Sequence, residues 1–251
     1  MLGMTSVTFR ELTCEKIIEL VKKSGLDGIE WGSDAHVLPG DLARAQDVAQ
    51  KTEAAGLKVL SYGSYYRLGN YPDPAAEFEK YVASAKTLKA PIIRIWAGSK
   101  GPEALTEEDY VAYAEECRTI CAIAAKENIT VAFEYHRYTV TQTLEGTLKL
   151  LKMANCPNLK TYWQPNPDII YREQLEEITA LLPYIVTIHT FTWVGNNIRY
   201  LMSAGVELWK EYMTLAKPAN PNYVMEFVKD DSTEIFLQDA KTLREIADAV
   251  Q

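Results

Sequence analysis

The chain has 251 residues, of which 47% are hydrophobic and 24% are charged. This composition is typical of a soluble globular protein and excludes a disordered chain. The formal net charge of −8 is opposite to the basic balance expected of a nucleic-acid-binding protein. No run of about 18 apolar residues occurs, so the sequence predicts no transmembrane helix.

Cellular location is indicated by the first residues and by the cysteines. The opening MLGMTSVTFRELT has neither a basic segment nor an apolar stretch, so it does not predict a secretory signal. The four cysteines, Cys14, Cys117, Cys121 and Cys156, show no CxxC spacing. We therefore expect reduced thiols and a cytoplasmic protein.

Short β-branched runs alternate with longer amphipathic segments along the whole chain. The runs predict strands over residues 2–9, 28–32, 58–66, 92–98, 130–136, 159–165, 185–193 and 223–229. The segments between and after them predict helices over 14–24, 41–55, 74–89, 106–127, 143–154, 170–182, 204–216 and 232–249. Thr106 and Ser232 stand where N-caps are expected, and Pro74 suits the first turn of its helix.

Eight strand–helix units in a chain of this length predict an α/β protein with a single (β/α)₈ TIM barrel domain spanning residues 1–251. A doubly wound open sheet is the alternative. It would usually carry a glycine-rich phosphate loop after its first strand, and the sequence contains neither GxGxxG nor GxxxxGK[ST]. The barrel is therefore the favoured prediction.

Polar and aromatic side chains recur near the carboxyl ends of the predicted strands, where TIM barrels place their active sites. They are Glu30, Arg94, Trp96, Glu134, His136, Gln164, His189 and Glu226. Glu134 and Glu226 are embedded in apolar runs, and a buried, unpaired carboxylate costs several kcal/mol. One such acid could belong to a structural ion pair, but two of them with a histidine on an intervening strand favour a metal ion.

These residues carry a resemblance to a known family. The segments GMTSVTFRELTCEKIIELVKKSGLDGIEWG, AFEYH, KTYWQP, HTFTW and MEFVKDD follow one another in the order of the xylose-isomerase-like barrel superfamily. The chain resembles in particular the branch of sugar phosphate isomerases and epimerases. The resemblance extends over nearly the whole chain and supports the TIM barrel.

The resemblance implies a divalent metal held by Glu134, Gln164, His189 and Glu226. Gln164 stands where the family usually has an aspartate, and its side-chain oxygen can still bind a hard cation. Two carboxylates and a neutral imidazole balance the charge of a divalent ion. We therefore expect Mn²⁺ or Mg²⁺, with Zn²⁺ or Co²⁺ as alternatives. The affinity should be modest, because glutamine lacks the negative charge of the usual aspartate. Alternatively, the glutamine at position 164 has abolished metal binding.

The resemblance also implies a sugar isomerase or epimerase that moves a proton next to a carbonyl through an enediolate. Glu134 and Glu226 would act as the acid–base pair on opposite faces of the substrate. Residues expected to bind substrate are Glu30, Arg94, Trp96, His136, Trp193 and Arg199. Two alternatives stay open at this stage: Glu30 and Arg94 could form a structural pair, and His136 could orient Glu134.

Competing functions remain. A lyase that dehydrates a polyol or keto acid would begin with the same proton abstraction, and a non-catalytic sugar-binding barrel would need no metal. An endonuclease of the same superfamily is disfavoured by three histidines and the negative charge. We expect a small sugar or polyol, without phosphate, as the partner, and neither nucleic acid nor membrane. A homodimer is a further expectation, with Trp209 and Tyr212 as candidate interface residues.

Overall fold

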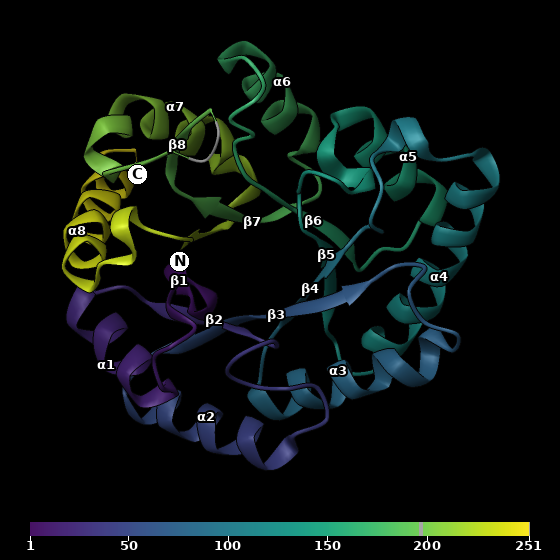
Figure 1. The fold of residues 1–251 in the computed structure, drawn as a ribbon, viewed down its shortest axis with the longest axis horizontal. Helices are drawn as coiled ribbons and strands as arrows, with labels where there is room; N and C mark the ends of the chain where they lie inside the picture. Colours follow the sequence, from purple (N-terminus) through teal and green to yellow (C-terminus); the bar gives the residue numbers. More distant parts are fainter. Residues whose placement is uncertain (196–197, 251) are drawn as a thin grey trace.

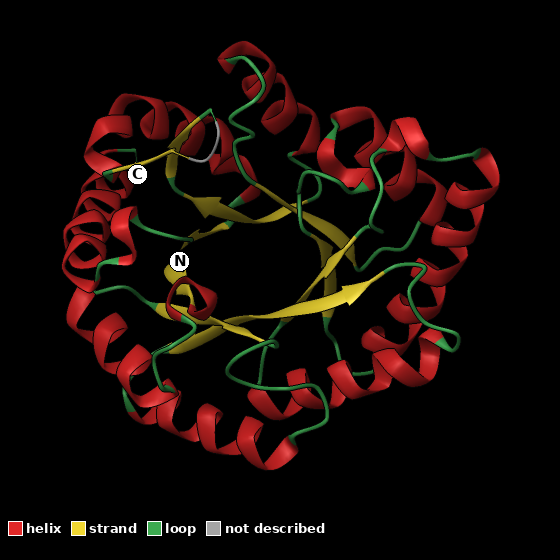
Figure 2. Ribbon diagram, in the orientation of Figure 1, coloured by secondary structure: helices red, strands yellow, loops and turns green. Residues whose placement is uncertain are grey.

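The computed structural model describes residues 1–195 and 198–250. Within them, eight parallel strands close into a barrel in the order β1-β10-β7-β6-β5-β4-β3-β2, and the helices form a ring around it (Figures 1 and 2). The barrel strands are β1 (Leu2–Thr5), β2 (Gly28–Gly32), β3 (Lys58–Arg67), β4 (Ile92–Trp96), β5 (Thr130–Phe133), β6 (Leu159–Trp163), β7 (Ile185–Thr190) and β10 (Asn222–Met225). The predicted TIM barrel fold is confirmed.

The helices follow the predicted ranges to within two residues at either end. They are α1 (Cys14–Ser24), α2 (Leu42–Ala54), α3 (Pro74–Leu88), α4 (Glu107–Ala125), α5 (Leu144–Ala154), α6 (Tyr171–Leu181), α7 (Val206–Ala216) and α8 (Thr233–Ala249). Thr106 forms a capping box with Asp109 at the start of α4, and the Ser232 side chain accepts from Ile235 N at the start of α8. Local capping chemistry thus sets the starts of these two helices.

Several strands end earlier than predicted. The prediction of a strand over 2–9 is wrong beyond Thr5, because Ser6–Phe9 forms a 3₁₀ turn. The predicted strand over 185–193 is split: β7 ends at Thr190, and β8 (Thr192–Val194) pairs antiparallel with β9 (Ile198–Tyr200). An alternating apolar pattern shows strand character but not the pairing partner. The chain leaves the barrel at its rim and pairs locally in a hairpin.

The main apolar core lies between the strands and the helices. Trp163 points outward into it, as expected, and its Nε1 donates to Glu177 Oε2 on α6 at 3.0 Å. Trp209 and Tyr212 are fully buried in the same layer. The expectation that they form a dimer interface is therefore wrong, because neither side chain reaches the surface.

The interior of the barrel combines a small apolar layer with charged side chains. Ile92, Ala132 and Tyr162 form a buried cluster separate from the main core. The Tyr162 hydroxyl donates to Glu30 at 2.8 Å, and its ring lies edge-on to His189, with the ring centroids 5.1 Å apart. The apolar layer therefore supports a polar centre.

Two further expectations concern the cysteines and membranes. All four cysteines are free, and Cys117 and Cys121 are buried on α4. Among the described residues, no helix combines the length and apolar character needed to cross a membrane.

Candidate active site

The polar side chains at the centre of the barrel are placed by the ends of four neighbouring strands. Glu134 directly follows β5, Gln164 follows β6, His189 lies near the end of β7, and Glu226 follows β10. Strand-like pairing continues one step beyond the strands, because Glu134 N donates to Ile95 O at 2.8 Å and Glu226 N to Thr190 O at 3.2 Å. Rigid backbone therefore holds both carboxylates at the carboxyl end of the barrel.

Four side chains converge at this end. Ligand atoms of Glu134, His189 and Glu226 lie within 4.8 Å of one another. Nδ1 of His189 lies 2.9 Å from Gln164 Oε1, 3.5 Å from Glu226 Oε2 and 3.9 Å from Glu134 Oε1. The four residues predicted to hold a metal are thus brought together around one point.

Beneath this point, Glu30 and Arg94 form the floor of the barrel centre. Arg94 Nη1 lies 3.4 Å from Glu30 Oε1 and 3.2 Å from Glu134 Oε2. Ser61 and Tyr162 donate their hydroxyl hydrogens to Glu30 Oε2 at 2.7 and 2.8 Å. Arg94 is 1% exposed and Glu30 is completely buried. Glu30 and Arg94 therefore form the buried pair that the sequence left open, and Arg94 keeps further donors for the pocket.

The buried charges at the centre do not cancel. Three carboxylates, Glu30, Glu134 and Glu226, face one guanidinium, Arg94, so two negative charges remain when His189 is neutral. Burial raises the pKa of Glu226. Burial alone would lower the pKa of His189, but nearby carboxylates, Glu226 foremost, outweigh it and hold that pKa above its ordinary value. The centre thus favours taking up protons or a divalent cation.

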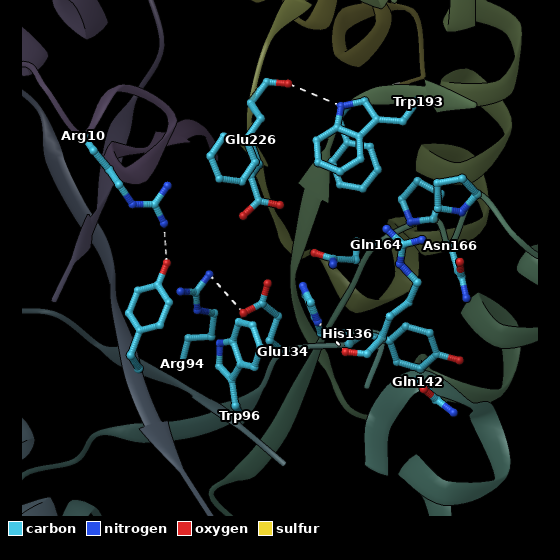
Figure 3. A pocket seen from close by; sticks show the side chains of 17 residues that line it. Arg10, Arg94, Trp96, Glu134, His136, Gln142, Gln164, Asn166, Trp193 and Glu226 are labelled. Carbon is cyan, nitrogen blue, oxygen red and sulfur yellow. Dashed lines mark hydrogen bonds and ion pairs between the residues drawn. The ribbon is translucent and has the colours of Figure 1, made fainter. Parts of the chain in front are cut away.

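A pocket of about 300 Å³ opens above the centre. Trp96 and Trp193 stand on opposite sides of it, with Glu134, Gln164 and Glu226 between them (Figure 3). Each tryptophan belongs to an aromatic wall. The rings of Trp96 and His136 lie tilted against each other at 33° with centroids 4.3 Å apart, and Trp193 stacks on Phe191 with centroids 4.1 Å apart. A small ring-shaped or planar molecule would fit between such walls.

Buried donors without partners line the same pocket. Nε and Nη2 of Arg94 and Nε1 of Trp96 have no hydrogen-bond partner within residues 1–195 and 198–250. Both residues come from β4 and line the pocket. Buried polar groups are normally paired, so unpaired donors at a pocket wall indicate that a ligand supplies the acceptor oxygens.

The residues predicted to bind substrate fall into two groups. Arg94, Trp96, His136 and Trp193 line the pocket. Glu30 lies beneath it, and Arg199, on β9, lies over the ring of Trp193 with its guanidinium carbon 5.6 Å from the ring centroid. Arg199 also pairs with Asp231 at 2.5 Å. The geometry therefore places Glu30 and Arg199 outside the pocket, where they support residues that line it.

The sequence did not single out Arg10 and Tyr65 as site residues, although both line the pocket. Arg10 follows the 3₁₀ turn after β1, and its Nη2 donates to Tyr65 Oη at 2.6 Å. Asp34 accepts from Arg10 Nε at 2.8 Å. The three tyrosines at the end of the third predicted strand were a signal, but strand parity alone did not separate Tyr65 from Tyr62 and Tyr66, which are buried in the outer layer.

Comparisons with known proteins agree with this architecture. The sequence model of the family described as xylose isomerase-like TIM barrel matches residues 18–197. The chain belongs to this family. Over 205 residues, the chain is 28% identical to a 3-dehydroshikimate dehydratase of Bacillus anthracis, covering 74% of this chain and 70% of that protein.

Several solved structures share the fold of this chain at low sequence identity. A probable 3-DHS dehydratase of Bacillus anthracis has a TM-score of 0.83 and 19% identity, covering 97% of this chain and 98% of that one. A 3-keto-D-glucoside 4-epimerase of E. coli has a TM-score of 0.75 and 13% identity, covering 98% of each chain. A Mycobacterium smegmatis barrel in complex with magnesium has a TM-score of 0.76 and 14% identity, covering 100% of this chain and 97% of that one.

Proposed function

We propose that this chain is a divalent-metal-dependent lyase that removes water from a small hydroxylated carbonyl compound. The observation that carries the proposal is the convergence of Glu134, Gln164, His189 and Glu226 at the floor of a pocket with two aromatic walls. Proton abstraction next to the carbonyl group would be the first chemical step.

The donor set fits a divalent ion. Two carboxylates, one imidazole and one amide oxygen are hard or borderline ligands that suit Mn²⁺ or Mg²⁺ and admit Zn²⁺ or Co²⁺. The two uncompensated negative charges of the centre match a doubly charged ion. When bound, such an ion would supply a positive charge that polarises a carbonyl oxygen.

His136 is the side chain best placed to take a proton from carbon. Its Nδ1 lies 2.7 Å from the backbone oxygen of Arg137, and a carbonyl oxygen can only accept, so Nδ1 carries the hydrogen. In neutral His136 the lone pair is then on Nε2, at the ring edge that points away from this carbonyl and into the pocket (Figure 3). Contact with the Trp96 ring holds the imidazole in place, as a general base requires.

Tyr65 is placed to give a proton to the departing hydroxyl group. A guanidinium has no acceptor, so Tyr65 Oη must accept from Arg10 Nη2, and its own hydrogen is left for another partner. Burial raises the pKa of Tyr65, which keeps the phenol protonated. Loss of one proton to His136 and departure of the hydroxyl with the proton of Tyr65 would leave a carbon–carbon double bond and one water molecule.

An epimerase is the second candidate. Glu134 and Glu226 approach the centre from β5 and β10, so a substrate between them could lose a proton on one side and regain it on the other. The lyase is preferred because the relative matched by sequence is a dehydratase, whereas the epimerase likeness, at 13% identity, concerns the fold.

The test combines metal analysis with product analysis. Purified protein is assayed for metal content before and after treatment with a chelator. Protein loaded with Mn²⁺ is then incubated with 3-dehydroshikimate, other cyclic hydroxy-keto acids and a panel of ketoses, and the products are identified by mass spectrometry. Metal-stripped protein is the matched control.

We expect a stoichiometric divalent ion and a product lighter than its substrate by one water molecule. A product of unchanged mass and altered stereochemistry would overturn the lyase in favour of the epimerase. Ligand binding that is indifferent to the chelator, without turnover, would favour the sugar-binding barrel.

A further inference from the structure

His189 meets a different group at each of its two ring nitrogens. Nδ1 lies 2.9 Å from Gln164 Oε1, an amide oxygen that can only accept, so Nδ1 carries a hydrogen here. Nε2 lies 3.4 Å from Glu30 Oε1. Neither Nε2 nor Glu30 Oε1 has a hydrogen-bond partner elsewhere in the described part of the chain. The two atoms are therefore the available partners for each other.

Glu30 can act only as an acceptor in this position. Ser61 and Tyr162 both donate to its Oε2, and Arg94 Nη1 approaches its Oε1. Three donors around one carboxyl group indicate the ionised form, which carries no hydrogen. A hydrogen shared between Glu30 and His189 must then belong to Nε2.

The position of the Glu30 side chain is fixed by its surroundings. A Cβ built on Gly63 would lie 2.9 Å from Glu30 Oε1, so glycine leaves the space that the carboxylate occupies. The ring of Tyr162 lies at 86° to that of His189 and limits rotation of the imidazole. Glu30 and the imidazole are thus held at a fixed separation across the barrel.

We propose that Glu30 is a positioning residue that accepts a hydrogen bond from Nε2 of His189 and keeps the hydrogen there when a metal ion takes the place of the hydrogen on Nδ1. Metal-binding histidines commonly donate their second N–H to a carboxylate, which fixes the tautomer and the orientation of the ring. This inference rests on the proposed metal site and replaces the earlier expectation that Glu30 binds substrate.

The first experiment reads the tautomer directly in the unmodified chain. A long-range ¹H–¹⁵N spectrum of ¹⁵N-labelled protein loaded with Zn²⁺, which is diamagnetic, reports each ring nitrogen as protonated, bare or metal-bound. The chain has three histidines, so comparison with His36→Gln and His136→Gln assigns the signals of His189. We expect a protonated Nε2 and a metal-bound Nδ1.

The second experiment measures Mn²⁺ affinity by calorimetry in two variants of Glu30. Glu30→Met removes the acceptor and should weaken affinity about 10–100-fold. Glu30→Gln should lose less, because the hydroxyls of Ser61 and Tyr162 can turn to accept from the new amide, leaving its oxygen for His189. Asp239→Asn is the matched control. Asp239 is also buried, but its carboxylate accepts a hydrogen bond from Met202 N, away from the metal site.

The outcomes separate this inference from the proposed function. If the unmodified chain binds neither Zn²⁺ nor Mn²⁺, the metal-dependent function fails. If it binds metal but His189 carries its hydrogen on Nδ1, the inference alone is overturned. Unchanged affinity in Glu30→Met, or equal losses in Glu30→Met and Glu30→Gln, would also overturn it. Should Glu30→Met not fold, the spectrum of the unmodified chain and the affinity of Glu30→Gln still decide.

Discussion

The side-chain oxygen of Gln164 lies 2.9 Å from Nδ1 of His189, and both atoms face the carboxylates of Glu134 and Glu226. An amide at this position supplies a ligand oxygen without a charge. Since Arg94 offsets one of the three central carboxylates, the centre keeps two negative charges. A carboxylate in place of Gln164 would leave an excess charge in the loaded site.

Replacement Gln164→Asp should tighten Mn²⁺ binding by about tenfold, because ligand charge raises affinity for hard cations. It should also lower the Tm of the metal-free protein, because one more buried like charge is unfavourable. Calorimetry and thermal melting measure the two effects. Asn166→Asp is the control, because it adds the same charge at the pocket wall but outside the ligand cluster. If both variants gain the same Mn²⁺ affinity, Gln164 is not a metal ligand.

The stability of the metal-free protein should fall as the pH rises. The pKa values of Glu226 and His189 are both raised in the folded chain. Their stabilising contributions are complete below the ordinary values of 4.5 and 6.5 and are lost as the pH passes the raised values. Bound metal takes the place of these protons, so the loaded protein should lack this loss.

The measurement is the Tm of loaded and stripped protein between pH 5 and 8, and the difference between the two should widen with pH. Burial also raises the pKa of Glu177 to about 7 and that of Asp239 to about 6. Both groups lie outside the metal cluster, so their contributions cancel in the difference. If the difference in Tm between loaded and stripped protein stays constant with pH, Glu226 and His189 do not take up protons in the metal-free protein.

The sequence predicted the elements of the fold well because most helices carry their own start signal; α6 and α7, which begin after Ile170 and Gly205, have no side-chain cap. The α4 range differs from the prediction by one residue at its start, where Thr106 forms the capping box. Strand ends were less predictable. Thr192–Val194 continues the apolar pattern of β7 but pairs with Ile198–Tyr200, and a pattern of alternate residues contains no information about the pairing partner.

The site was predictable where strands determine it and less so where turns do. The convergence of Glu134, His189 and Glu226 follows from their places at the ends of parallel strands, because barrel closure brings those ends together. Arg10 reaches the pocket through the turn formed by Ser6–Phe9. Its position depends on backbone angles in that turn, which hydrophobic periodicity does not specify.

His136→Asn should reduce turnover by about 10²–10⁴-fold, the usual contribution of a general base. The asparagine amide can still donate to the Arg137 backbone oxygen in place of Nδ1, whereas the atom corresponding to Nε2 is lost. Mn²⁺ affinity should stay unchanged, because the ring of His136 is not part of the metal cluster. Wild-type turnover in this variant would contradict the role of His136 as base.

Glu226→Gln should abolish turnover while the fold stays intact. Burial already raises the pKa of Glu226, so a neutral amide of the same shape is compatible with the metal-free centre. The variant loses a ligand charge that the loaded centre requires. Circular dichroism and thermal melting test the fold, and an activity assay tests turnover; turnover that survives would show that Glu226 takes no part in the chemistry.

Gly63→Ala tests the coupling between barrel packing and the metal site. The added Cβ would lie 2.9 Å from Glu30 Oε1 and 3.2 Å from Glu30 Cδ, and Ser61 and Tyr162 oppose any shift of that carboxylate. We expect the free energy of unfolding to fall by about 1–3 kcal/mol, as for overpacked cores. Mn²⁺ affinity should fall as well, because Glu30 would move relative to His189.

A stability-matched control separates these two effects. Gly56 has a φ of +78° and no atom within 4 Å of its Cβ position, so Gly56→Ala strains the backbone without touching the barrel centre. It should lower the free energy of unfolding and leave Mn²⁺ affinity unchanged. If Gly63→Ala also leaves the affinity unchanged, displacement of Glu30 is not transmitted to His189, and the contact between them does not position the imidazole.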